Sequence, residues 1–430
     1  MRLAVLALVA ACSGNVGTIS VSLVTAPGST VLDNAETLQL TITNPHTVST
    51  SPRGASGFEI DVDLPANGDA GQLIVDAFDA GGNRVATGMS PPFAVGAIDA
   101  SVAIYMAAPN TIGASPATLS VPLSALAAGP LSYGAIFAGG RDATGAPSNQ
   151  TSIYNAFDHS VLLGVALPAP LSGVTAAVGG SGIVYLFGGA DATGTATADL
   201  LRFDTTIAPN GAFTDDGVQS GLARAGQLAI PLGNDDYIVT GMPVADLAGI
   251  TGDATARSDI TSLPAAGASV LASDGSTIAL FASSAGVSRL RADTFDSLAI
   301  AGAARDNAVL VALPGGQIAV ACGSTDLVII DPLAGTSQTI PDTPATARGG
   351  CAAAATSRHL LIAGGDDFDP MAYVLDASTF APVATVPMVV PRKDAVAIAL
   401  PDDQILIAGG VDATGAPTQT IELFTPDSPE

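Results

Sequence analysis

Several residue types are rare or absent in this sequence, and each shortage narrows the functions that the chain can serve. Tryptophan is absent, lysine occurs once, as Lys393, and histidine and cysteine occur three times each. The 39 acidic residues outnumber the 14 basic ones and give a net charge of -25. Such a field repels phosphate backbones, so it disfavours nucleic-acid binding and favours contact with cations. The acidic residues are scattered singly through predicted turns, which indicates a solvated acidic surface.

Long apolar runs are also missing, apart from one at the N-terminus. Residues 3–11 are apolar and follow Arg2, but this run is too short to span a bilayer and resembles the apolar region of a signal peptide. Val9-Ala10-Ala11-Cys12 resembles the lipobox of bacterial lipoproteins, in which Cys12 becomes the acylated N-terminus; the alternative is a buried strand with a chance cysteine. The resemblance implies a signal segment over residues 1–12, a lipid anchor as the only contact with the membrane, and, with Ser13 after the cysteine, the outer membrane of the cell envelope.

The two remaining cysteines are Cys322 and Cys351. An envelope location would permit a disulfide between them. Cys322 ends one predicted strand and Cys351 opens the inner strand of the next repeat, so antiparallel neighbours would place both at the same edge. The alternative is that both are small buried apolar residues.

Residues 16–110 contain short alternating segments at roughly ten-residue spacing, with no helical period. Turn residues such as Pro27-Gly28 separate these segments. The predicted strands are residues 17–24, 38–42, 58–64, 72–78, 84–87 and 102–106. The pattern predicts a β-sandwich that is immunoglobulin-like in outline, serving as a spacer between the membrane and the next domain.

One kind of segment recurs through the rest of the chain. Residues 405–426 contain an apolar run, the pair Gly409-Gly410, the turn Asp412–Pro417 and an alternating strand; Asp142–Pro147 repeats that turn letter for letter. The residues that end the equivalent apolar runs are Gly139, Gly188, Gly241, Ala282, Gly323, Gly364 and Gly409. Their steps of about 40 to 50 residues are typical of four-stranded propeller blades.

The predicted fold is therefore all-β, with an N-terminal β-sandwich followed by a β-propeller over residues 131–430. The anchors indicate about seven four-stranded blades, or six because the third and fourth repeats are weak. Residues 111–130 are rich in proline and alanine and would form a linker, or would contain a strand at residues 117–123 that completes a blade. The last blade lacks an outer strand of its own, which closure from the N-terminal side would supply.

The apolar runs, the Gly-Gly pairs, the delayed aromatic residues and ends such as Asp331-Pro332 resemble kelch and galactose-oxidase-central-domain propellers. This resemblance covers residues 131–430, although the chain lacks the outer-strand tryptophan of kelch repeats. Galactose oxidase uses a copper site with tyrosine and histidine ligands. Here His46, His159 and His359 are dispersed along the chain, so a copper oxidase is disfavoured and no cofactor is expected.

Four arginines recur at one position of the repeat, each about 16 to 18 residues before an anchor. They are Arg224, Arg305, Arg348 and Arg392. Equivalent positions of a closed propeller lie on a ring, so four guanidinium groups could line one mouth of its channel and bind an anion. The alternative, which we favour, is that each arginine bonds carbonyls or aspartates of the adjacent blade.

A run of carboxylates, Asp366, Asp367 and Asp369, follows the Gly364 anchor. Oxygen ligands this close in sequence could hold Ca²⁺, but the order of residues in an EF-hand loop is absent, and an acidic surface turn is the favoured interpretation.

We find no phosphate-binding loop and no nucleophile elbow in the sequence. The first hypothesis is therefore a non-catalytic binding or scaffolding lipoprotein of the bacterial envelope, which presents its propeller loops to a protein or glycan. The second is a metal-free carbohydrate-active enzyme with carboxylates as acid and base. The third is a structural protein of an envelope assembly.

Overall fold

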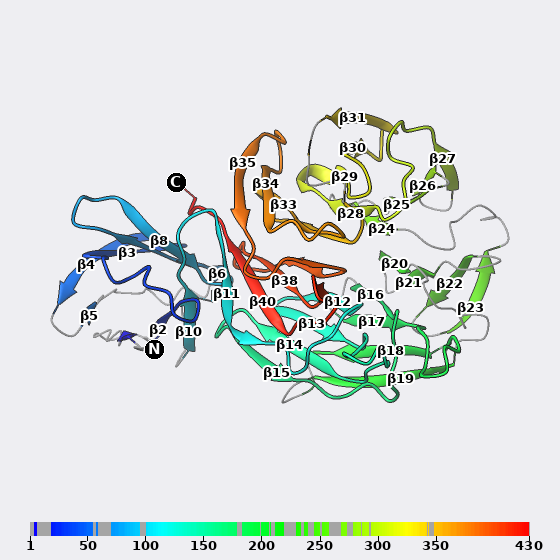
Figure 1. Cartoon of the computed structure of the whole chain (residues 1–430), viewed down its shortest axis with the longest axis horizontal. Helices are drawn as coiled ribbons and strands as arrows, with labels where there is room; N and C mark the ends of the chain where they lie inside the picture. The colour runs from blue at the N-terminus through cyan, green and yellow to red at the C-terminus, as the bar shows by residue number, and fades with distance from the viewer. Residues whose placement is uncertain are drawn as a thin grey trace.

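The computed structural model describes most of the chain in two β-rich parts (Figure 1). The described residues are 4–6, 19–54, 57–58, 70–94, 100–178, 183–197, 199–205, 207, 211–218, 229–233, 236–239, 245–249, 252–257, 268–272, 278–284, 286–291, 294–341, 343 and 348–429. Over these residues the fold is all-β, with one short 3₁₀ turn at Pro314–Gly316.

The N-terminal part is a β-sandwich made of two sheets. One sheet contains β1 (Ala4–Leu6), β2 (Ile19–Val24) and β10 (Ala100–Tyr105), in the order β1-β2-β10, with β10 parallel to β2. The other runs β5-β4-β3-β7-β8, with β3 (Thr37–Thr43), β4 (His46–Gly54), β5 (Gly57–Phe58), β7 (Leu73–Phe78) and β8 (Arg84–Met89). A two-stranded ribbon joins β6 (Ala70–Gly71) to β9 (Phe93–Ala94).

Alternation of side chains builds the core of this sandwich. Leu38, Leu40 and Ile42 on β3 lie in one buried cluster with Val21 of β2 and Val102 of β10. Strand β4 was not predicted, because its outward positions are polar and only Ser51 is buried. The predicted strand at residues 58–64 falls outside the described residues beyond Phe58.

The rest of the described chain forms seven four-stranded antiparallel sheets, which we number as blades 1 to 7. Blade 1 holds β12 (Ala127–Leu131), β13 (Gly134–Ala138), β14 (Thr151–Asn155) and β15 (Ser160–Leu163). Blade 2 holds β16 (Thr175–Val178), β17 (Val184–Phe187), β18 (Asp199–Asp204) and β19 (Ala212–Val218). Blade 3 holds β20 (Ala229–Gly233), β21 (Asp236–Val239), β22 (Ala245–Gly249) and β23 (Gly252–Arg257).

Blade 4 holds β24 (Ala268–Leu271), β25 (Ile278–Ser283), β26 (Gly286–Arg291) and β27 (Thr294–Leu298). Blade 5 holds β28 (Val309–Ala312), β29 (Ile318–Ala321), β30 (Leu327–Asp331) and β31 (Thr336–Ile340). Blade 6 holds β32 (Cys351–Ala355), β33 (His359–Gly364), β34 (Met371–Asp376) and β35 (Pro382–Pro387). In blade 7 the order is β37 (Val396–Ala399), β38 (Ile405–Ala408), β40 (Thr420–Thr425) and β11 (Thr111–Thr118).

The inner strands close the ring. Each inner strand packs against that of the next blade, and β37 of blade 7 packs against β12 of blade 1. The prediction of a sandwich followed by a propeller of about seven four-stranded blades is therefore confirmed. A small ribbon of β36 (Arg392–Lys393) and β39 (Val411–Asp412) lies beside blade 7.

Blade 7 is completed from the N-terminal side. Strand β11 pairs antiparallel with β40 and supplies its outer strand, so the propeller begins at Thr111 and not at residue 131. The predicted strand at residues 117–123 lies several residues too late, because Leu119 and Leu123 instead pack into the core between blades 7 and 1. The region predicted as a linker or closing strand thus holds both β11 and the start of β12.

The Gly-Gly anchors allow neighbouring blades to approach closely. Gly364 has a φ of 71°, and a Cβ added there would lie 2.3 Å from the carbonyl oxygen of Arg392 in the next blade. Its neighbour Gly365 donates a backbone hydrogen bond of 3.0 Å to that same oxygen. This contact between blades requires glycine, because glycine has no side chain and adopts a left-handed backbone conformation without strain.

Candidate functional site

The arginines predicted to form an anion-binding ring are buried in the blades. Arg305, Arg348 and Arg392 have exposed fractions of 6%, 5% and 0%; Arg224 lies outside the described residues. In each, Nη1 contacts two backbone carbonyls, one at the anchor and one where the third strand of its own blade begins. For Arg392 these are the carbonyls of Gly409, at 3.1 Å, and Thr420, at 2.8 Å.

Two of these arginines also bind carboxylates. Arg348 bonds Asp369 through Nη2 and lies 3.1 Å from Asp367 through Nε, while Arg392 bonds Glu422, and both members of that pair are fully buried. Burial lowers the pKa of Arg392, which the Glu422 carboxylate partly offsets. The three described arginines therefore bind the loop that follows each anchor, within their own blade. Their guanidinium groups are not presented to an anion.

The carboxylate run after Gly364 is engaged in the same loop. Asp367 and Asp369 pair with Arg348, and Asp366 accepts the backbone N–H of Gly349 at 3.2 Å. Among the described residues, no group of three His, Cys, Asp or Glu side chains is placed to hold a metal ion.

The cysteines at the edge of blade 6 are joined. Cys322, just after β29, and Cys351, which opens β32, form a disulfide with Cα atoms 5.9 Å apart. This bond joins blade 5 to blade 6 close to Arg348. Cys12 lies outside the described residues, and no helix among those described is long and apolar enough to cross a membrane.

The histidines remain apart. His159 is buried, accepts the N–H of Tyr105 at Nε2 and contacts the hydroxyl of Tyr154 through Nδ1 at 2.7 Å, so both of its ring nitrogens are in use. His359 packs edge-on against Phe424 in blade 7, and His46 is exposed on β4. The histidines are therefore not arranged as a copper ligand set.

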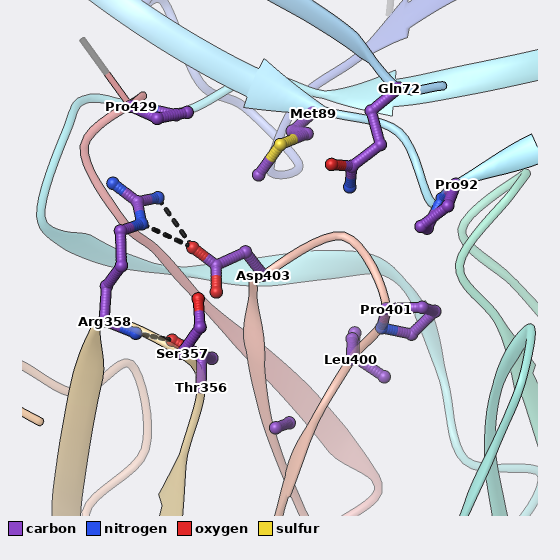
Figure 2. A pocket seen from close by; sticks show the side chains of 11 residues that line it. Gln72, Met89, Pro92, Thr356, Ser357, Arg358, Leu400, Pro401, Asp403 and Pro429 are labelled. Carbon is purple, nitrogen blue, oxygen red and sulfur yellow. Dashed lines mark hydrogen bonds and ion pairs between the residues drawn. The ribbon is translucent and has the colours of Figure 1, made fainter. Parts of the chain in front are cut away.

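An opening with a mixed lining lies where the sandwich meets blades 6 and 7. We call it the seam cleft, and its volume is about 440 Å³. Gln72, Met89 and Pro92 line it from the sandwich, and the propeller lines it with the turn at residues 356–358 and the turn between β37 and β38. Figure 2 shows the side chains of Gln72 and Met89 directed into the space above Asp403.

An ion pair forms the polar wall of the seam cleft. Arg358 donates from Nε at 2.9 Å and from Nη2 at 2.6 Å to one oxygen, Oδ2 of Asp403 (Figure 2). Asp403 has a φ of 62°, which aspartate tolerates, and this turns its carboxylate toward Arg358. The lining also includes the apolar residues Leu400, Pro401 and Pro429.

A much smaller space, which we call the chamber, adjoins the seam cleft. Its volume is about 10 Å³, and Met89 and Arg358 line both spaces. Asp402 and Gln404 also line it, with exposed fractions of 1% and 2%. Oδ2 of Asp402 and Oε1 of Gln404 are buried without a hydrogen-bond partner, and burial raises the pKa of Asp402 to about 7.

No motif or spacing in the sequence indicates that the two sides of this site come together. Asp402-Asp403 is recognisable only as a turn before an anchor strand, and the sandwich residues that face it lie more than 300 positions earlier. Only the docking of the sandwich onto the propeller assembles them.

Comparison with known proteins supports the fold. No protein-family model and no curated protein matches the sequence. A solved structure of a novel fungal alcohol oxidase of the AA5 family, in complex with copper, is similar with a TM-score of 0.57 and 14% identity, over 72% of this chain and 75% of that one. The chain therefore has a β-propeller fold similar to that of this oxidase; at this identity the likeness shows the fold and not the activity.

Proposed function

We propose that this chain is a non-catalytic binding or scaffolding lipoprotein of the bacterial envelope, anchored through Cys12 to the outer membrane, which holds a protein or glycan partner. Processing at Cys12 would remove β1, which pairs with the edge of β2 in the full chain, and would leave the pairing of β2 with β10. The seam cleft carries this proposal, because it combines apolar walls with a few polar groups, as ligand sites do. Its two sides come from two domains, so a ligand there would contact both.

The disulfide supports the proposed location in the cell envelope. A bond between Cys322 and Cys351 persists in an oxidising compartment such as the bacterial periplasm or cell surface. Metabolic labelling with an alkyne fatty acid tests the anchor, with Cys12→Ser as the variant that should lose the label. Label retained in that variant would contradict the lipidation step.

A cross-linking experiment tests the binding role. Ser357 is an exposed residue of the seam cleft lining, and Thr193 is exposed on a turn of blade 2. A photoreactive residue at position 357 should give one discrete cross-linked product in the native envelope, and the same residue at 193 should not. Equal labelling from both positions would contradict a partner site in the cleft.

A second candidate, a metal-free carbohydrate-active enzyme, rests on one observation. Asp402, with its pKa near 7, is adjacent to Asp403, which pairs with Arg358, and glycoside hydrolysis needs one protonated and one ionised carboxyl group. Reducing-sugar release from envelope glycans, abolished by both Asp402→Asn and Asp403→Asn, would establish it in place of the binding role. Copper-dependent oxidation of an alcohol would instead assign the activity named for the fungal neighbour.

A further inference from the structure

The chamber beside the seam cleft is bounded by oxygen atoms that have no donor. Asp402 Oδ2 and Gln404 Oε1 are both buried hydrogen-bond acceptors without a partner, and both residues line the chamber. The other polar atoms of these side chains are occupied, since Asp402 Oδ1 accepts the Gln404 N–H at 3.3 Å and Gln404 Nε2 donates to Thr425 at 3.0 Å. Buried acceptors of this kind are costly, so a missing donor is the expected explanation.

We propose that the chamber binds a primary ammonium group, whose alkyl chain lies in the seam cleft. A volume of about 10 Å³ is at the lower limit for one water-sized group, and an ammonium ion is about that size. Its N–H donors would satisfy Asp402 Oδ2 and Gln404 Oε1, and its carbon chain would lie against Met89 and Pro429. This inference rests on the proposed binding role of the seam cleft and names the chemistry recognised there.

Charge favours a cation over a neutral donor at this position. The charged groups in the chamber lining are Asp402, Arg358 and Asp427, and Arg358 is paired with Asp403. A second cation, Arg84, bonds Asp427 and Ser428, so both guanidinium groups are already paired with carboxylates. The phenol of Tyr154 also interacts with Asp402. The whole chain carries a net charge of -25, which attracts cations toward its surface. A metal ion is less suited, because no group of three His, Cys, Asp or Glu side chains among the described residues is placed to hold one, and hard cations take six or more oxygen ligands.

Calorimetric titration of the full chain with four probes tests this assignment. The probes are n-butylamine, n-butanol, the peptide acetyl-Gly-Lys-Gly-amide and its norleucine counterpart. We expect saturable binding at pH 8 for the two amines and none for the two neutral controls. Stronger binding of the lysine peptide would identify a protein side chain as the source, and binding of butylamine alone would identify a free amine; both outcomes support the ammonium site.

The pH dependence and two variants complete the test. Ionisation of Asp402 should strengthen amine binding by about 100-fold between pH 5 and pH 8. Asp402→Asn keeps the shape of the side chain and should abolish binding, whereas Asp33→Asn, the same change at an exposed site, should not. The inference would be overturned if the wild type bound neither amine, or if the Asp402→Asn variant bound the amines as tightly as the wild type does. An ordered water would then be the remaining explanation for the two oxygen atoms. A position-357 cross-link that persists in that case would show that the binding role stands without an ammonium site.

Discussion

Tyr105, the last residue of sandwich strand β10, donates its backbone N–H to Nε2 of His159 over 3.2 Å. His159 lies in the turn between β14 and β15 of blade 1, where Phe157 also accepts the N–H of Ala103 at 2.7 Å. Because Nε2 accepts this hydrogen bond, the proton of the neutral ring lies on Nδ1, which donates a hydrogen bond to the Tyr154 hydroxyl. This turn of the propeller therefore extends the hydrogen bonding of a sandwich strand, which fixes the two domains together beside the last blade.

This contact makes stability dependent on pH. Burial lowers the pKa of His159 to about 4, whereas an unfolded histidine titrates near 6.5. The unfolded chain thus binds a proton first, so the stabilisation is complete above about pH 6.5 and is lost as the pH falls toward 4. The loss is on the order of 3 kcal/mol. Nuclear magnetic resonance of the three histidine rings measures this pKa directly.

The variant His159→Asn separates this effect from the titration of carboxylates. Asparagine tolerates the φ of 52° at this position, but it cannot reproduce the imidazole contacts. The free energy of unfolding of the variant should fall less steeply between pH 6.5 and 4 than that of the wild type. A His159 ring that titrates near 6.5 in the folded protein would contradict the buried, neutral assignment.

The anchor glycines offer a matched pair for testing the joint between blades. Gly364 and Gly415 both have positive φ, but an added Cβ meets the Arg392 carbonyl at the first and nothing within 4 Å at the second. Gly415→Ala should cost roughly 1–2 kcal/mol for the left-handed backbone. Gly364→Ala should cost about 1–3 kcal/mol more, because blade 7 must move away. Urea denaturation of both variants measures the difference, and equal losses would contradict close approach as the reason for the glycine.

Sequence patterns predicted the propeller because its repeats use local rules that recur. The pair at Gly409 and the turn at Asp412, whose Oδ1 accepts the N–H of Thr414 at 2.8 Å, follow from backbone geometry within a few residues. The same spacing showed that Arg348 and Arg392 are equivalent, but not where their side chains point. The direction of each side chain is set by hydrogen bonds to backbone carbonyl groups of its own blade. These carbonyl groups lie 16 to 28 residues later in the chain.

The seam cleft and the chamber could not be predicted from the sequence, for a related reason. Asp402 is buried in the turn between β37 and β38, and Met89 lines the same chamber from a sandwich strand far away in the chain. No sequence periodicity links these positions, because the sandwich packs against the propeller at one place and not once in every repeat. The weak third and fourth repeats show the same limit, because blades 3 and 4 keep four strands while their anchors have lost the paired glycines.

The ion pair of Arg392 and Glu422 should be strongly coupled. Glu422→Gln would leave a fully buried guanidinium without its counter-charge and should cost about 3–5 kcal/mol. The added change Arg392→Met should recover part of that loss, because it removes the unpaired charge. A double-mutant cycle in urea measures the coupling.

A partly exposed pair supplies the control for this cycle. Arg289 bonds Asp296 at 2.7 Å, and the aspartate side chain is 39% exposed. Asp296→Asn should therefore cost no more than about 1 kcal/mol, because solvent screens the pair. Similar losses at the two sites would show that burial does not set the strength of the Arg392 pair.

The disulfide should contribute to stability through the loop that it closes. Cys322 and Cys351 are separated by 29 residues, and closing a loop of this length restricts the unfolded chain by about 3–4 kcal/mol. Cys322→Ser combined with Cys351→Ser should lower the free energy of unfolding by that amount, and a reductant should weaken the wild type but leave the double variant unchanged. Equal stability of the oxidised and reduced wild type would contradict this contribution. Because the bond joins blades 5 and 6, hydrogen exchange should show that its loss loosens β29 and β32 before the sandwich.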